Sequence, residues 1–204
     1  MKLKITTFLL LSIFLFNSCF TRKPEMAQHH FDVVETDINS IHQAFKKRTC
    51  NCEILVSEYL QRIQTYDQST HLNSIITTNF DAIKTARELD KEYKRTGKLR
   101  LLHCIPMIIK DNYQTAGLQT TGGSILFKGF KPDEDAHMVK LLKDAGVIVL
   151  AKSNMAEWAF SPKVTISSMA GETLNPYNLA YTTAGSSGGT AAAVAANLGE
   201  AGVG

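Results

Sequence analysis

The sequence predicts an α/β fold with a mixed, largely parallel sheet covered by helices. Three neighbouring segments carry this prediction: an apolar run at 101–109, a helical pattern at 137–145 and a short, wholly apolar run at 147–151. Strands that are apolar on both faces are typical of parallel sheets, because helices cover both sides of such sheets. Strand, helix and strand in this order predict a βαβ unit, and Gly146 separates the helix from the second strand.

Two further helices and a strand are predicted upstream of this unit. The first helix begins near Glu53, and its apolar residues recur at the three- and four-residue spacing of an amphipathic helix. A short strand is expected at 74–78. Asn79 is placed to cap the second helix, which Gly97 ends.

The segments downstream of Gly117 are mostly loops. Residues 117–129 are loop-like, and 161–183 form an irregular stretch that is longer than most connections between elements. Long loops in compact domains often shape binding sites. The Gly- and Ser-rich segment 185–190 then passes directly into an Ala-rich helix at 191–197, which predicts a loop that presents its backbone N–H groups at a helix start.

The overall composition fits one globular domain and does not fit a disordered, fibrous or membrane-embedded protein. The chain has 204 residues, of which 44% are hydrophobic and 20% are charged. A formal net charge of +3 is too small to indicate binding to nucleic acid, so no nucleic-acid partner is expected. The six His residues are scattered without metal-ligand spacing, and we expect no metal or other cofactor.

The amino-terminal segment is typical of an export signal. It has a basic start, Met-Lys-Leu-Lys, followed by an apolar run at 5–16, which is shorter than the roughly 20 residues of a membrane-spanning helix. Cys19 directly follows Ser18, as in the lipobox of bacterial lipoproteins, although Phe16 and Asn17 depart from its commonest form.

This pattern divides the chain into three parts. We predict a lipoprotein-type signal peptide at 1–18, a polar tether at 19–31 and the folded domain at 32–204. Cys19 would carry the lipid, which would anchor an exported protein to a membrane of the cell envelope. Plain secretion without an anchor is the alternative.

The other cysteines predict neither a disulfide framework nor a zinc site. Cys50, Cys52 and Cys104 are odd in number, so they cannot all be paired. Cys50 and Cys52 are too close in sequence for an unstrained bridge, and no second pair completes a zinc site. The Cys50-Asn51-Cys52 segment is therefore interpreted as incidental.

Lys110 is the first residue with an unusual position, because it ends the apolar segment Ile105-Pro106-Met107-Ile108-Ile109. A lysine at a strand end often only reaches for water. If the side chain is instead buried, desolvation lowers its pKa and makes it a candidate general base.

The second unusual feature is the Gly185-Ser186-Ser187-Gly188-Gly189-Thr190 loop. Its glycines permit a tight backbone, and its hydroxyl groups lie next to a helix dipole. An ordinary turn with a capping Ser is one alternative. A phosphate cradle is another, but the loop lacks the Lys that follows the last Gly of a P-loop.

Together and in this order, these features resemble the amidase-signature family. The resemblance extends from about Ser57 to Gly204, and its strength comes from the ordered set of fragments. The fragments are 57–63, 72–76, 105–112, 145–154, Glu157-Trp158-Ala159, Asn175-Pro176-Tyr177 and 185–197. One departure is Cys104, where family members usually have Gly before the Ile-Pro pair, which puts close backbone packing at this position in question.

The resemblance implies roles for particular residues. Lys110 matches the catalytic lysine of a Ser–cis-Ser–Lys triad, and Ser186 matches the serine that follows a cis peptide bond and relays a proton from the attacking serine. Ser187 is the neighbour most easily confused with Ser186. The remaining supporting residues of the loop are Gly185, Gly188 and Gly189.

The resemblance also implies what residues 1–204 lack. In the family the attacking serine and the oxyanion-hole N–H groups lie in a Gly-Gly-Ser turn shortly after the segment that matches Ala201-Gly202-Val203-Gly204. We therefore expect an amidase that acts on a small-molecule carboxamide, with the base and relay present but the nucleophile absent, so that residues 1–204 alone are inactive. The alternative is a catalytically dead lipoprotein that binds an amide, a peptide or a partner subunit.

Overall fold

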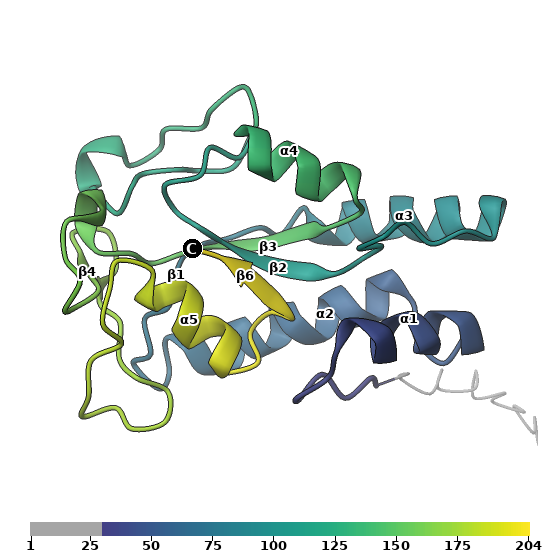
Figure 1. Ribbon diagram of the computed structural model, residues 1–204, viewed down its shortest axis with the longest axis horizontal. Helices are drawn as coiled ribbons and strands as arrows, with labels where there is room; N and C mark the ends of the chain where they lie inside the picture. Colours follow the sequence, from purple (N-terminus) through teal and green to yellow (C-terminus); the bar gives the residue numbers. More distant parts are fainter. Residues whose placement is uncertain (1–29) are drawn as a thin grey trace, which may run out of the picture.

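The structure is a computed structural model that describes residues 30–204 (Figure 1). The predicted signal peptide at 1–18, the lipid-attachment residue Cys19 and all but the last two residues of the tether lie outside the described residues. Within the described part, no helix has both the length and the apolar character needed to cross a membrane.

Helices and a mixed sheet make up the described part of the chain, as predicted. The α-helices are α1 (Ile38–Lys47), α2 (Cys52–Arg62), α3 (Ala82–Thr96), α4 (His137–Asp144) and α5 (Gly188–Ala195). The strands are β1 (Ile75–Thr78), β2 (Pro106–Lys110), β3 (Ile148–Ser153), β4 (Ile166–Ser167), β5 (Gly171–Glu172) and β6 (Ala201–Val203). Single turns of other helix types lie at Ile63–Asp67, Ile125–Phe127 and Glu157–Ala159.

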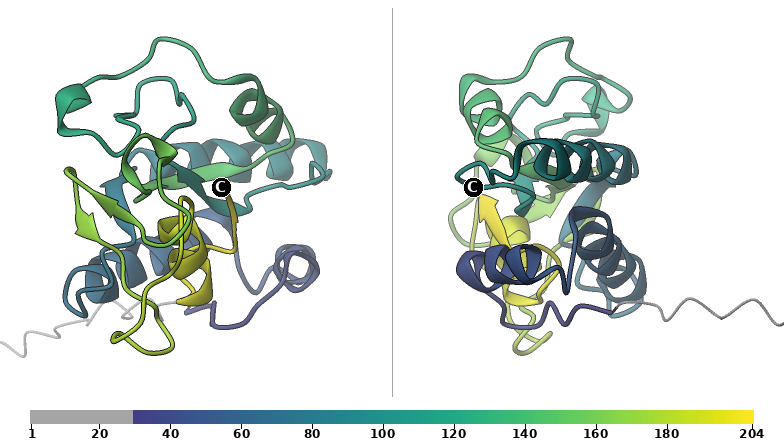
Figure 2. Two further views of the ribbon diagram at one scale, coloured as in Figure 1. Left: turned by 60° about the vertical axis from the view of Figure 1, so that its left-hand side comes forward. Right: turned by 90° about the vertical axis from the view of Figure 1, so that its right-hand side faces the viewer.

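The main sheet is largely parallel and has the order β1-β3-β2-β6. Strand β2 pairs in parallel with both β3 and β6, and β1 pairs antiparallel with β3. Helix α4 lies over one side of this sheet, whereas α2 and α5 lie over the other side (Figures 1 and 2). Both faces are thereby covered, which explains why every residue of β2 and β3 is buried.

The β2–α4–β3 unit confirms the predicted βαβ unit, but β2 is shorter than the predicted strand. It begins at Pro106, because the preceding residues form turns that bind the two residues after α4. The N–H of Leu102 donates to the carbonyl of Ala145, and the N–H of Cys104 donates to that of Gly146. Cys104 has a left-handed φ of 59°, which a straight strand cannot accommodate.

Helix α3 also begins later than predicted. Asn79 does not cap it: its side-chain amide donates to the carbonyl of Val149 at 2.8 Å, so it ties the end of β1 to β3. The helix starts at Ala82 instead, after Asp81. Its predicted end is confirmed, because Gly97 adopts a left-handed φ of 66° and donates its N–H to the carbonyl of Tyr93.

One α-helix and three strands were not predicted from the sequence: α1, β6, and the short strands β4 and β5, which pair with each other inside the stretch that was expected to be irregular. Helix α1 begins after Asp37, whose carboxylate accepts from the N–H of Ser40, and it buries Ile41 and Phe45. Strand β6 is only three residues long and pairs with β2.

The interpretation of the cysteines was wrong in one respect. Cys52 and Cys104 form a disulfide, with their Cα atoms 5.6 Å apart, whereas Cys50 is free and buried. The pair joins the first residue of α2 to the turn before β2. The two cysteines are 52 positions apart in sequence, so no local pattern could reveal their pairing. Cys104 is fully buried despite its left-handed backbone, which is a conformation that glycine adopts more readily.

Candidate active site

Lys110 lies at the carboxyl end of β2 and is buried, with 5% of the residue exposed. Its neighbours along the strand are apolar, and the sheet brings β6 alongside it. Burial lowers the pKa of the Lys110 amine from its ordinary value, because desolvation disfavours the charged form. Of the two interpretations of this lysine, the buried one is correct.

Ser186 and Ser187, in the Gly- and Ser-rich loop at 185–190, contact this amine. The Nζ of Lys110 lies 2.8 Å from Oγ of Ser186 and 2.7 Å from Oγ of Ser187. The peptide bond between Gly185 and Ser186 is cis, as the family resemblance implies. Both hydroxyls are therefore within hydrogen-bonding distance of the amine.

Other segments hold this loop in place. The carbonyl of Ser186 accepts from the N–H of Ala156 at 3.0 Å, which fixes the loop against the segment after β3. Helix α5 begins directly after Ser187. A Cβ on Gly189 would overlap the backbone carbonyl of Asn154, and one on Gly188 would overlap neighbouring threonine hydroxyls, so both positions require glycine.

A second buried lysine lies behind the site and was not identified as a site residue from the sequence. Lys152, on β3, is fully buried, and its Nζ lies 3.9 Å from Oδ1 of Asp111, which directly follows Lys110. Lys152 also donates to the carbonyl of Tyr113 and to the hydroxyl of Thr120. Burial lowers the pKa of Lys152 to about 8 and raises the pKa of Asp111, because desolvation outweighs their mutual attraction.

Asp111 organises the loop that follows β2. Its Oδ2 accepts from the hydroxyl of Thr121 and from the backbone N–H groups of Thr121 and Gly123. The carbonyl of Gly122 in turn accepts from the N–H of Trp158. Asp111 and Lys152 occur in the family-like fragments, but their pairing depends on the β2–β3 register and not on a local motif.

A cavity of about 280 Å³ adjoins these segments. Aromatic side chains form part of its wall, and Phe127 packs edge-on against Trp158, with ring centroids 5.5 Å apart. Asn112, two residues after Lys110, and Met155, next to Ala156, contribute to the same wall. Lys110 and Ser186 do not line this cavity, but part of its wall comes from segments directly adjacent in sequence to those that carry and hold them.

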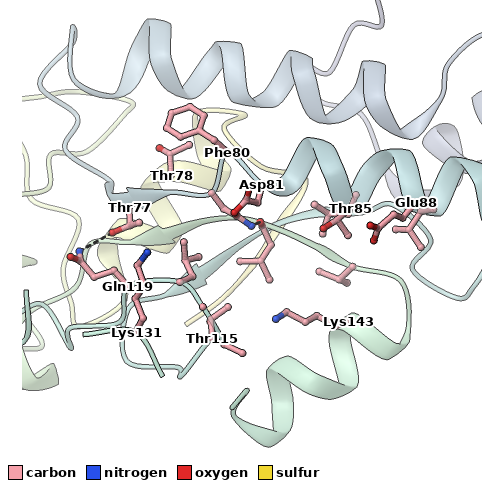
Figure 3. Close-up of a pocket in the computed structure, with 18 of the residues that line it drawn as sticks. Thr77, Thr78, Phe80, Asp81, Thr85, Glu88, Thr115, Gln119, Lys131 and Lys143 are labelled. Carbon is pink, nitrogen blue, oxygen red and sulfur yellow. Dashed lines mark hydrogen bonds between the residues drawn. The ribbon is translucent and has the colours of Figure 1, made fainter. Parts of the chain in front are cut away.

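A different cavity, of about 840 Å³, lies away from this site (Figure 3). It opens between α3, the end of β1 and the loop at 115–119, and Gln119 there donates to the hydroxyl of Thr77. Lys131 and Lys143 are among its lining residues, but Lys110, Ser186 and Ser187 are not. None of its lining residues comes from 111–114 or 154–160, the segments that follow Lys110 and hold the Ser186 loop, so this cavity lies apart from the candidate site.

Comparison with known proteins identifies the family of this chain. A family model described as Amidase matches residues 54–204. The chain is 35% identical over 175 residues to a probable amidase of Arabidopsis thaliana, and the match covers 82% of this chain and 34% of that protein. It is 38% identical over 159 residues to a glutamyl-tRNA(Gln) amidotransferase subunit of Prochlorococcus marinus, and this match covers 78% of this chain and 32% of that protein.

Solved structures agree with these sequence matches. The peptide amidase of Stenotrophomonas maltophilia superposes with a TM-score of 0.75 and 41% identity, over 81% of this chain and 35% of that one. An amidase family protein of Bacillus anthracis superposes with a TM-score of 0.78 and 39% identity, over 84% of this chain and 35% of that one. The chain thus spans about a third of the length of these relatives. With a family model matched over most of its length, a largely parallel sheet and a fold shared with solved amidases, this chain belongs to the amidase family.

Proposed function

We propose that this chain supplies the general base and the proton relay of an enzyme that hydrolyses a carboxamide C–N bond. The observation that carries the proposal is the contact of a buried amine, Lys110, with the Ser186 hydroxyl at 2.8 Å. A lysine whose pKa is lowered by burial can lose its proton and then act as a base.

In the proposed mechanism, neutral Lys110 accepts the hydroxyl proton of Ser186 while Ser186 accepts a proton from the attacking serine. That serine forms an acyl-enzyme with the substrate carbonyl, and the amine leaves with the relayed proton. Water then attacks the acyl group and releases the carboxylic acid, which restores the serine. By family resemblance, the attacking serine and the oxyanion hole belong to a turn that follows Gly204, so residues 1–204 alone are proposed to be inactive.

The aromatic cavity supports a preference for carboxamides that carry a hydrophobic group near the scissile bond. Phe127, Phe130 and Trp158 provide apolar area at its wall, and aromatic side chains bury such groups favourably. A peptide amide with an apolar side chain fits this description, which agrees with the similarity to a peptide amidase. The similarity to a glutamyl-tRNA(Gln) amidotransferase subunit supports glutamyl-tRNA(Gln) as a second candidate substrate. The proposed export signal favours the peptide amide over this second candidate.

Hydrolysis tests this proposal, using protein expressed from the complete reading frame and a panel of primary amides with apolar or charged side chains. We expect measurable release of ammonia, fastest for apolar amides. Ser186→Ala is expected to lower kcat/KM by at least roughly 100-fold, because the relay is removed. Ser187→Ala is the matched control, since its hydroxyl lies equally close to Nζ, and it should cost less. No hydrolysis of any amide, or a larger loss at Ser187, would contradict the proposal.

We further propose that the protein is exported and lipid-anchored through Cys19. The charged start, short apolar run and Ser18-Cys19 pair support this proposal. The disulfide between Cys52 and Cys104 also supports it, because disulfides persist mainly in oxidising compartments.

Metabolic labelling with a fatty-acid analogue tests the anchor. The wild-type protein should incorporate the label and fractionate with membranes. Cys19→Ala should remove the label, because no thiol remains at the proposed attachment position, whereas Cys50→Ser, a matched cysteine change in the folded domain, should not. Equal labelling of wild type and Cys19→Ala would show that the lipid is attached elsewhere or not at all.

A further inference from the structure

A second chemical cluster lies where α2 begins, next to the turn that precedes β2. It consists of Cys52, His103 and Cys104, whose ligand atoms all lie within 4.8 Å of one another. At most 1% of each residue is exposed. Cys104 is six positions before Lys110, at the opposite end of β2 from that lysine, so the cluster is separate from the proposed active site.

His103 has an unusual environment within this cluster. Its side chain is fully buried, yet neither Nδ1 nor Nε2 has a hydrogen-bond partner. Buried polar atoms in folded proteins nearly always have a partner, and an exception typically indicates a bound ion, a water molecule or a functional role. A neutral imidazole always offers one nitrogen lone pair, which suits it to bind a metal ion.

The spacing of the cluster suits a tetrahedral ion. With Zn–S bonds of about 2.3 Å and Zn–N bonds of about 2.0 Å, the ligand atoms of a zinc site lie roughly 3.5 to 3.8 Å apart. The three ligand atoms here are already within 4.8 Å before any adjustment. A cavity of about 570 Å³ adjoins the cluster and is lined in part by Cys50, Cys52 and His103.

We propose that, when the disulfide is reduced, Cys52, Cys104 and His103 form a binding site for Zn²⁺. Reduction by a thiol or phosphine transfers two electrons to the disulfide, which takes up two protons and becomes two thiols, and the reductant is oxidised. Zn²⁺ then displaces both thiol protons and binds the two thiolates and one nitrogen of His103. Water occupies the fourth position, on the side of the cavity.

The disulfide and the metal are mutually exclusive, because both use the same two sulfur atoms. Either one ties α2 to the turn before β2, so the cross-link between these elements is kept in both redox states. Bound Zn²⁺ also gives the His103 ring the partner that it lacks in the disulfide form. No local motif reveals the site, since 50 residues lie between Cys52 and the His103-Cys104 pair.

Zinc titration of the full chain tests this proposal, with a chromophoric chelator as competitor and a phosphine as reductant. The reduced chain should bind one Zn²⁺, and the oxidised chain should bind at least about 100-fold more weakly because its sulfurs are not available. Co²⁺ in place of Zn²⁺ should give sulfur-to-metal charge-transfer absorption and the visible bands of a tetrahedral site. Reduced chain that binds no Zn²⁺, or oxidised chain that binds equally well, would overturn the proposal.

Variants identify the ligands in the reduced state. Cys104→Ser should weaken binding at least about 100-fold and His103→Gln at least about tenfold, because even groups outside the ligand shell commonly contribute that much. His103→Gln should also shift the visible Co²⁺ bands, which a merely structural change would leave alone. Cys50→Ser is the control and should retain binding, with circular dichroism confirming that each variant is folded. If Cys50→Ser lost as much affinity as Cys104→Ser, Cys50 would also be a ligand and the proposed ligand set would be wrong.

Discussion

Lys110→Met is expected to lower kcat/KM for amide hydrolysis by about 10⁴-fold or more in protein expressed from the complete reading frame. Residues that act as one catalytic unit are strongly non-additive, so removing one member costs nearly as much as removing several. Methionine preserves the length and apolar stem of the side chain but has no amine. The buried amine contacts both serines of the loop, and no other base lies within hydrogen-bonding distance of Ser186 among the described residues.

The pH dependence of the wild-type enzyme provides a second readout of the same residue. The base must be neutral to accept a proton, so activity should rise with pH as Lys110 loses its charge. Because burial lowers the pKa of Lys110 below 10.5, this rise should be complete at a lower pH than for an exposed lysine. Residual activity of Lys110→Met should lack this rise. A variant that keeps activity within tenfold of wild type would show that Lys110 is not the base.

Lys152→Met is expected to lower the free energy of unfolding by about 3–5 kcal/mol. Lys152 and Asp111 are both fully buried, with 3.9 Å between Nζ and Oδ1. Without the lysine, the Asp111 carboxylate would remain buried without a cation, and the carbonyl of Tyr113 would lose its donor. Urea denaturation of the full chain, analysed by linear extrapolation, measures the change.

Two further variants isolate the cause of this loss. Lys140→Met removes an exposed ion pair with Asp144 and should have little effect, because surface pairs contribute little to stability. Adding Asp111→Asn to Lys152→Met should recover part of the lost stability, since the uncompensated charge is then gone. If Lys152→Met were as mild as Lys140→Met, the buried pair would not stabilise this part of the fold.

Local patterns explain which parts of the fold could be predicted from the sequence. The β2–α4–β3 unit depends on apolar runs and a glycine that lie within about 50 residues of one another, and its hydrophobic period identifies each element. The sequence patterns at Lys110 and in the Gly185–Gly189 loop each span only a few residues, so they could be recognised locally. The contact between Lys110 and Ser186 could be predicted only from the family resemblance, because the two residues are 76 positions apart in sequence.

The features that were missed depend on tertiary contacts. The disulfide joins residues 52 positions apart, and the Asp111–Lys152 pair depends on the register between β2 and β3. The predicted strand at 101–109 began too early because the apolar residues Leu101 and Leu102 lie in the turn before β2, where Leu101 is exposed. Helix α1 has a capping Asp37 and apolar residues at helical spacing, so closer attention to the cap could have identified it.

The most direct test of the account is to locate the serine that a fluorophosphonate probe modifies, because Ser186 is proposed to relay a proton and not to attack. Protein from the complete reading frame would be labelled, digested and mapped by mass spectrometry, with residues 1–204 and Lys110→Met treated in parallel. We expect the probe on a serine that follows Gly204, much slower labelling of Lys110→Met, and no labelling of residues 1–204. Probe bound to Ser186 or Ser187 would instead identify the nucleophile within this loop and contradict the proposed relay.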